Sequence, residues 1–64
     1  MDLKMDAHVL LSLVNTRLRN DHASLEALAD AYAIDAGELE MKLDAIGYVY
    51  DAKENCFVSG PKKD

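Results

Sequence analysis

The side chains best suited to catalysis or metal binding in this sequence are two histidines and one cysteine, His8, His22 and Cys56. Metal sites usually draw such ligands from short, regularly spaced groups, whereas these three lie in separate segments. Neither histidine stands beside a serine or cysteine in a recognised nucleophile arrangement, and no glycine-rich phosphate loop is present. We therefore expect a protein that is not an enzyme and that has no metal, cofactor or small-molecule ligand.

Arginines 17 and 19 form the clearest basic cluster and are the first candidate partner-binding residues. Cations at the C-terminal end of a helix interact favourably with the helix dipole, so Arg17 and Arg19 could simply stabilise that end. Alternatively, they could contact a phosphate or an acidic partner. The sequence leaves both interpretations open.

The net charge of −5 is concentrated in one stretch of the chain. Residues 24–50 contain six acidic side chains and a single cation, Lys42, which gives −6 + 1 = −5 and accounts for the whole excess. These acidic residues are Glu26, Asp30, Asp35, Glu38, Glu40 and Asp44. Any partner of this stretch must tolerate or prefer a negative surface.

This acidic stretch disfavours DNA binding through its second half. Phosphates require cations, and base edges are read mostly by Arg, Lys, Asn and Gln. A helix over residues 36–46 would instead present Glu38, Met41 and Asp44, with Lys42 at its flank. The outward face is expected to be either a solvated acidic surface or a protein-contact surface centred on Met41.

Two tyrosines, Tyr48 and Tyr50, are the remaining candidates for partner binding. Tyrosine is enriched among the residues that dominate binding energy at protein interfaces. The two residues alternate along a β-prone segment and so share one face. They could anchor a partner, or they could cover the first helix with their hydroxyl groups in water.

These candidates must be positioned by a small fold whose first element is an amphipathic helix beginning after the N-cap Asp6. Its apolar side chains span roughly 200° of the helix surface, although burial on one side needs only about 100°. The side chains concerned are Ala7, Val9, Leu10, Leu11, Leu13, Val14 and Leu18. We expect either two flanking elements or contact with a second chain.

Residues 24–47 predict two short helices joined by a tight turn. Ser24 and Asp35 are the expected N-caps, and Gly47 is the expected left-handed residue after the second helix. Segments 48–50 and 56–58 predict strands, with residues 51–55 as their loop. Simple alternation places Val49 with Phe57 on one face of this hairpin, and Tyr48, Tyr50, Cys56 and Val58 on the other.

The predicted fold class is α+β, mainly α: a three-helix, winged-helix-like domain with a short C-terminal β-hairpin. We expect one domain over residues 1–64, with an ordered core over about 6–58 and a mobile tail over 59–64. The segments LLSLVNTRLR, SLEAL and IGYVYD, with a later Asn and Phe, also resemble a family of short bacterial proteins of unknown function. That resemblance covers nearly the whole chain and implies no activity.

The function we expect is a small cytoplasmic protein–protein interaction module, homodimeric through the first helix or the hairpin. The cytoplasmic expectation rests on the charged N-terminal residues and on an apolar run, VLLSLV, that is too short to span a membrane. The alternative is a winged-helix-like, transcription-associated protein that binds DNA through Arg17, Arg19 and the tail lysines, Lys62 and Lys63.

Overall fold

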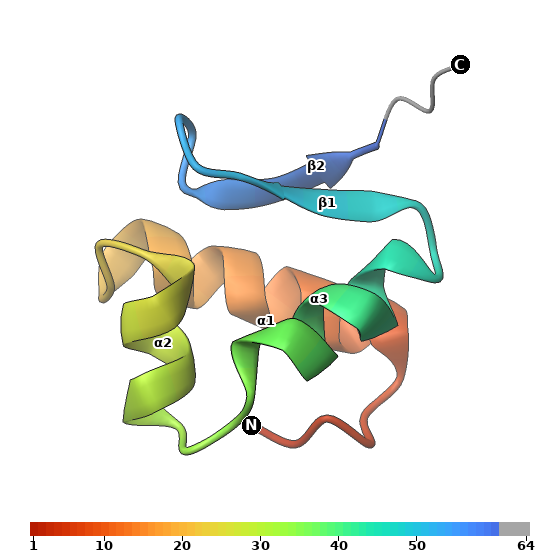
Figure 1. Cartoon of the computed structure of the whole chain (residues 1–64), viewed down its shortest axis with the longest axis horizontal. Coiled ribbons are helices and arrows are strands. Elements are labelled where there is room, and N and C mark those ends of the chain that lie inside the picture. The colour runs from red at the N-terminus through yellow and green to blue at the C-terminus, as the bar shows by residue number, and fades with distance from the viewer. Residues whose placement is uncertain (61–64) are drawn as a thin grey trace.

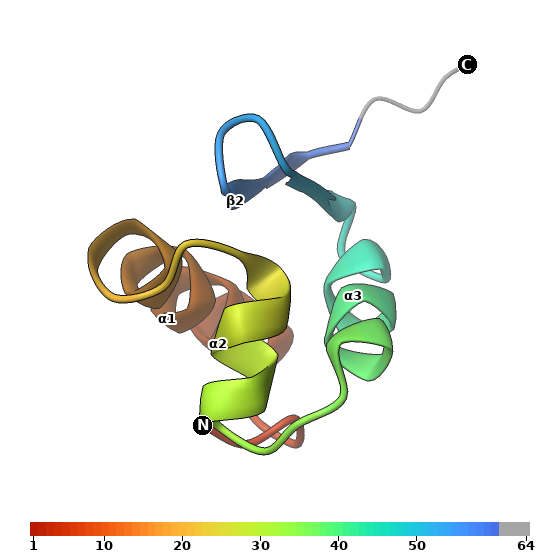
Figure 2. The same ribbon diagram turned by 60° about the vertical axis from the view of Figure 1, so that its left-hand side comes forward.

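The computed structural model describes residues 1–60, which form three helices followed by one antiparallel hairpin. The elements are α1 (Ala7–Asn20), α2 (Leu25–Ala31), α3 (Ala36–Asp44), β1 (Tyr48–Asp51) and β2 (Cys56–Ser59). The hairpin lies along one side of the helices (Figure 1), with β2 beside α1 and β1 beside α3 (Figure 2). The predicted α+β, mainly α class is confirmed. Of the predicted tail, Ser59 ends β2, and residues 61–64 lie outside the described part of the chain.

Each helix begins at a polar side chain that accepts hydrogen bonds from the first free backbone N–H groups. Asp6 accepts from the N–H groups of His8 and Val9, at 2.8 and 3.4 Å. Ser24 accepts from Ala27, and Asp35 accepts from Gly37 and Glu38. These bonds confirm all three predicted N-caps. Capping motifs can be predicted from sequence because they depend only on neighbouring residues.

A residue with a left-handed backbone conformation follows each of α2 and α3. Ala33 has φ 56°, and the Ile34 N–H donates to the Ala29 carbonyl in the pattern of a Schellman motif. Gly47 has φ 87°, the conformation predicted for it, and turns the chain into β1. The two positions fix where α3 and β1 start relative to the rest of the molecule.

The Asp6 cap gives the fold a pH dependence that can be measured. The His8 N–H, and to a lesser degree the Val9 N–H, lower the pKa of Asp6, with further help from the positive charges of His8 and Lys42. Because the folded pKa is below the unfolded one, the cap stabilises the fold above the unfolded pKa. This stabilisation is lost as the pH falls through the folded pKa.

We therefore expect wild type to unfold at a higher temperature than Asp6→Ala near neutral pH, and the difference to shrink as the solution is acidified. Thermal unfolding of both proteins over a pH series would measure it, and carboxyl ¹³C chemical shifts would follow Asp6 directly. A difference that stays constant down to strongly acid pH would show that the Asp6 charge contributes nothing.

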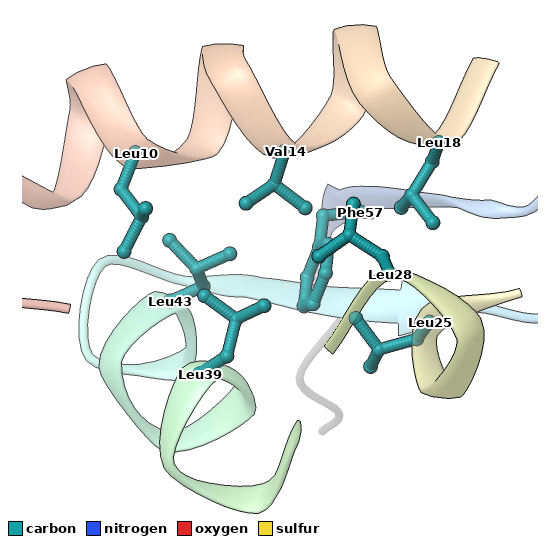
Figure 3. Close-up of a cluster of buried hydrophobic side chains, with 8 residues drawn as sticks. All are labelled: Leu10, Val14, Leu18, Leu25, Leu28, Leu39, Leu43 and Phe57. Atoms are coloured by element: carbon teal, nitrogen blue, oxygen red, sulfur yellow. The ribbon is translucent and has the colours of Figure 1, made fainter. Parts of the chain in front are cut away.

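The core lies where α1, α2, α3 and the hairpin meet (Figure 3). Its fully packed side chains come from every helix and from β2. They are Leu10, Val14, Leu18, Leu25, Leu28, Leu39, Leu43 and Phe57. The helical members recur at intervals of three or four residues, so each helix turns one apolar stripe inward, as the sequence predicted.

Most of the wide apolar arc of α1 packs against other parts of the same chain. Helix α1 contacts both other helices and β2, so it is flanked on more than one side. The N-terminal residues, which we expected to lie outside the core, add further cover because Met1, Leu3 and Met5 pack against it. Val9 is the large apolar residue of α1 that remains mostly exposed, at 54%.

The predicted facing of the hairpin is wrong by one residue. The observed pairs are Val49 with Val58, Tyr50 with Phe57, and Asp51 with Cys56, so the loop has four residues instead of five. Directly opposed residues share a face, and a shift of one residue moves every side chain of a strand to the other face. Phe57 therefore lies with the tyrosines against the core, and Val49 faces outward with Val58.

The short loop is stabilised by local geometry that alternation of side chains does not reveal. Asp51 accepts from the N–H groups of Lys53 and Glu54, and Asn55 has φ 54°. Asparagine adopts this left-handed conformation more readily than most residues. Asp51 thus belongs to β1, and the loop is one residue shorter than predicted.

Candidate interaction groove beside β1

A groove runs along β1, bounded by α3 on one side and continuing toward the start of α2. Its first part, of about 310 Å³, is lined by Gly37, Glu40, Met41, Asp44, Val49 and Tyr50. Its second part, of about 360 Å³, shares Glu40 and Tyr50 and is lined further by Ala23, Ser24, Leu25, Glu26 and Ala52. We call the two parts together the β1 groove.

Two of the residues that line the groove are exposed apolar side chains. Met41 is 74% exposed and Val49 is 37% exposed, although both are large hydrophobic residues. Met41 was predicted as the centre of a protein-contact surface, whereas Val49 was expected to pack with Phe57. The register of the hairpin is what brings Val49 to the surface beside Met41.

The charged residues that line the groove are all acidic. Glu26, Glu40 and Asp44 line it, and no lining residue carries a positive charge. Lys42, the cation of α3, is half-buried and close enough to Asp6 to contribute to lowering the pKa of that carboxyl. Glu38 is exposed in the first turn of α3 but does not line the groove. The predicted Lys42 and Glu38 candidates thus lie outside the β1 groove.

The two arginines are not brought together into one patch. The Arg17 guanidinium is 3.4 Å from the Asp21 carboxylate, one helical turn further on, and both side chains are half exposed. Arg17 lies on the outer face of α1 with His8, whereas Arg19 lines a separate depression with Glu54. Both do lie in the last turn of α1, which is the position expected for dipole stabilisation.

Tyr50 is held by hydrogen bonds within the fold while its ring also lines the groove. Its hydroxyl donates to the Asn55 side-chain oxygen at 2.6 Å and accepts from the Leu25 N–H at 3.3 Å. Its ring lies 5.5 Å from that of Phe57. Tyr48 is half-buried and packs against the core. Of the two tyrosines, Tyr50 therefore lines the groove as a side chain held in place, whereas Tyr48 does not line it.

Two asparagines that sequence reasoning left out hold the hairpin to the helices. The Asn15 side chain donates to the Phe57 carbonyl at 3.1 Å and accepts from the Phe57 N–H at 2.7 Å. The Asn55 side chain donates to the carbonyls of Leu18 and His22. Asn15 is one of the polar residues of α1, and β2 lies against it. An asparagine at the end of a hairpin loop was the only local signal available for Asn55.

The histidine and cysteine side chains considered in the sequence lie apart from the β1 groove. His8 lies 3.7 Å from Asp6 on the exposed surface of α1, and Cys56 is a half-buried free thiol. No three His, Cys, Asp or Glu side chains of the described chain are arranged to hold a metal ion. None of the helices in residues 1–60 combines the length and apolar character needed to span a membrane.

Comparison with known proteins identifies the family. A family model described as Domain of unknown function (DUF4250) matches residues 4–57, so the chain belongs to this family. The match confirms the predicted resemblance to a family of unknown function. No curated protein and no solved structure matches the chain. Inference about function therefore rests on the groove itself.

Proposed function

We propose that this member of the DUF4250 family is a cytoplasmic protein–protein interaction module whose contact surface is the β1 groove. The observation that carries the proposal is the pair of exposed apolar side chains, Met41 and Val49, in one groove. Methionine is enriched at protein interfaces and adapts its shape to different partners. The groove also has a firm wall, because hydrogen bonds and packing hold Tyr50. The role is one of binding, not catalysis.

The occupant we favour is a segment of another protein, although a second copy of this chain is the expected competitor. Val9 on α1 offers a second exposed apolar site, 54% exposed, that could support self-association. However, the six residues around that site all belong to one helix, so no second element shapes it. The β1 groove is built from α2, α3 and β1 and can enclose a ligand on more than one side.

DNA binding is the alternative function, and the positions of the charges argue against it. Glu40, Met41 and Asp44 lie on the outward side of α3, where a recognition helix would need cations. Arg17 and Arg19 lie in different depressions and so do not form one phosphate-binding surface. A mobility-shift assay at low salt, where electrostatic affinity is strongest, should show no binding to mixed genomic fragments.

A displayed library of random peptides tests the proposed function directly. Peptides enriched on the wild-type protein should bind at least ~10-fold more weakly to Met41→Asp, because a buried anchor at an interface often contributes that much. Val9→Asp is the matched control, since it makes the same kind of change at another exposed apolar residue. Its affinity for the same peptides should match wild type.

Two results would contradict the proposal. One is the enrichment of no peptide by a folded, monomeric protein. The other is a set of enriched peptides whose binding depends on Val9 and not on Met41. Sedimentation equilibrium of the protein alone belongs to the same test, because a dimer dissociated by Met41→Asp would assign the groove to a second copy.

A further inference from the structure

We propose that the occupant of the β1 groove is an extended, lysine- or arginine-containing segment of a partner protein, which adds to β1 as a third strand. This inference rests on the proposed function and specifies the chemistry of the partner. It follows from the backbone of β1, from the opposite edge of the hairpin and from the charges along the groove.

The register of the hairpin determines where the backbone groups of β1 point. The Gly60 N–H donates to the Gly47 carbonyl, so this pair exchanges hydrogen bonds across the hairpin. Hydrogen-bonded pairs alternate with non-bonded pairs in an antiparallel ladder. Val49 therefore bonds to Val58 opposite it, whereas the N–H and C=O groups of Tyr48 and Tyr50 point away from β2.

The outer edge of β1 therefore presents a row of free hydrogen-bonding groups. Within residues 1–60, no other group forms a hydrogen bond to the backbone N–H or C=O of Tyr48 or Tyr50. An edge strand of this kind is a ready template for an added strand. Several peptide-binding domains use such an edge beside a helix, with backbone bonds for affinity and pockets for alternate side chains.

At the other edge of the same hairpin, on β2, the outward-pointing backbone N–H and C=O groups of Phe57 are bonded within the chain. At Phe57, which lies opposite Tyr50, the Asn15 amide supplies one acceptor and one donor. A single side chain from α1 thus makes the two bonds that a neighbouring strand would make. Within the described chain, no equivalent side chain does this for Tyr50, so the two edges are treated differently.

The groove is shaped to hold a chain that lies along this edge. Its two parts share Glu40 and Tyr50, and together they are lined by Val49 and Tyr50 of β1 and by Ala52 just after it. Side chains of an added strand alternate between two faces, about 7 Å apart along one face. Apolar side chains of the segment would then lie on Met41 and Val49, and the next side chains would face the carboxylates.

The negative charges along the groove favour a positively charged partner. Glu26, Glu40 and Asp44 line it without a cation, and they belong to the stretch that carries the whole net charge of −5. Lysine and arginine in the added segment would complement these carboxylates, and acidic segments would be repelled. A nucleic acid would be repelled as well, because its backbone carries phosphates.

The test uses a short synthetic peptide that alternates lysine and valine, titrated into the ¹⁵N-labelled protein and followed by NMR. Saturable binding should slow hydrogen exchange at the amides of Tyr48 and Tyr50 and shift their protons downfield. The amide of Val49 is an internal control, because it is already bonded to Val58 and should change least. A peptide with glutamate in place of lysine should not bind.

Two N-methylated peptides separate strand addition from simple electrostatic attraction. In one, the methyl groups replace the N–H groups that would face β1. In the other, they are moved by one residue and replace the N–H groups that point away. We expect binding of the first to be lost and binding of the second to be retained. Equal binding of both, or of the glutamate peptide, would overturn the inference.

A matched pair of charge variants completes the experiment. Glu40→Gln with Asp44→Asn should weaken binding of the lysine–valine peptide about 10-fold. Glu38→Gln with Glu54→Gln removes the same charge outside the groove and should have little effect. If library peptides bind through Met41 but the lysine–valine peptide does not bind, strand addition by a cationic segment is wrong while the proposed function stands.

Discussion

Asn55→Gly is expected to lower the free energy of unfolding by about 2–4 kcal/mol, although no apolar group is removed. The Asn55 side chain makes three hydrogen bonds, to the Leu18 and His22 carbonyls and to the Tyr50 hydroxyl. Each contributes about 0.5–1.5 kcal/mol, and partners left unpaired in a half-buried site add to the loss. Glycine keeps the left-handed backbone at φ 54°, so the measured loss reports the side chain.

Urea unfolding followed by circular dichroism measures this effect, with Asn55→Asp and Tyr50→Phe as companions. Aspartate keeps the acceptor for Tyr50 but places a carboxylate against two carbonyl oxygens, so it should be at least as destabilising as glycine. Tyr50→Phe removes only the hydroxyl and should cost about 1 kcal/mol, which leaves a folded protein for comparison. If Asn55→Gly were as stable as wild type, the network around Asn55 would be irrelevant to the fold.

Leu39→Ala is expected to lower the free energy of unfolding by about 2–5 kcal/mol, because it leaves a cavity in a close-packed core. Leu39 is fully buried and lies beside Leu43 in the core (Figure 3). A domain of this size has a net stability of only about 3–5 kcal/mol, so the variant should be largely unfolded at 37 °C. Thermal and urea unfolding would show this directly.

Met41→Ala is the matched control for this prediction, because it truncates a large apolar side chain of the same helix at an exposed position. Its stability should lie within about 0.5 kcal/mol of wild type. The two variants together separate the side chains that hold the molecule together from those available to a partner. Equal destabilisation by both would show that Met41 belongs to the core and would remove the basis for the groove.

The parts of the fold that depend on near neighbours were predictable from the sequence. The caps at Asp6, Ser24 and Asp35 each act over two or three residues, and the apolar stripes repeat within each helix. Met41 was identified as exposed for the same reason. These features follow from helix geometry alone, whichever elements surround the helix.

The parts that depend on distant neighbours were missed. Asn15 bonds to Phe57, 42 residues away in the sequence, and Asn55 bonds to Leu18, 37 residues away. No periodicity predicts such pairs, so the sequence does not distinguish Asn15 from the other polar residues of its helix. The register of the hairpin depends on the length of its loop. Because the predicted loop was one residue too long, Val49, the second apolar side chain of the groove, was assigned to the same face as Phe57.

The pairing of Asn15 with Phe57 also constrains when the domain can form during protein synthesis. Helix α1 emerges from the ribosome early, but the backbone groups that bond to Asn15 arrive with β2, along with the Phe57 ring of the core. The core therefore cannot be completed until residue 57 has left the exit tunnel. The hairpin, with the open edge of β1, likewise forms only after β2 has emerged.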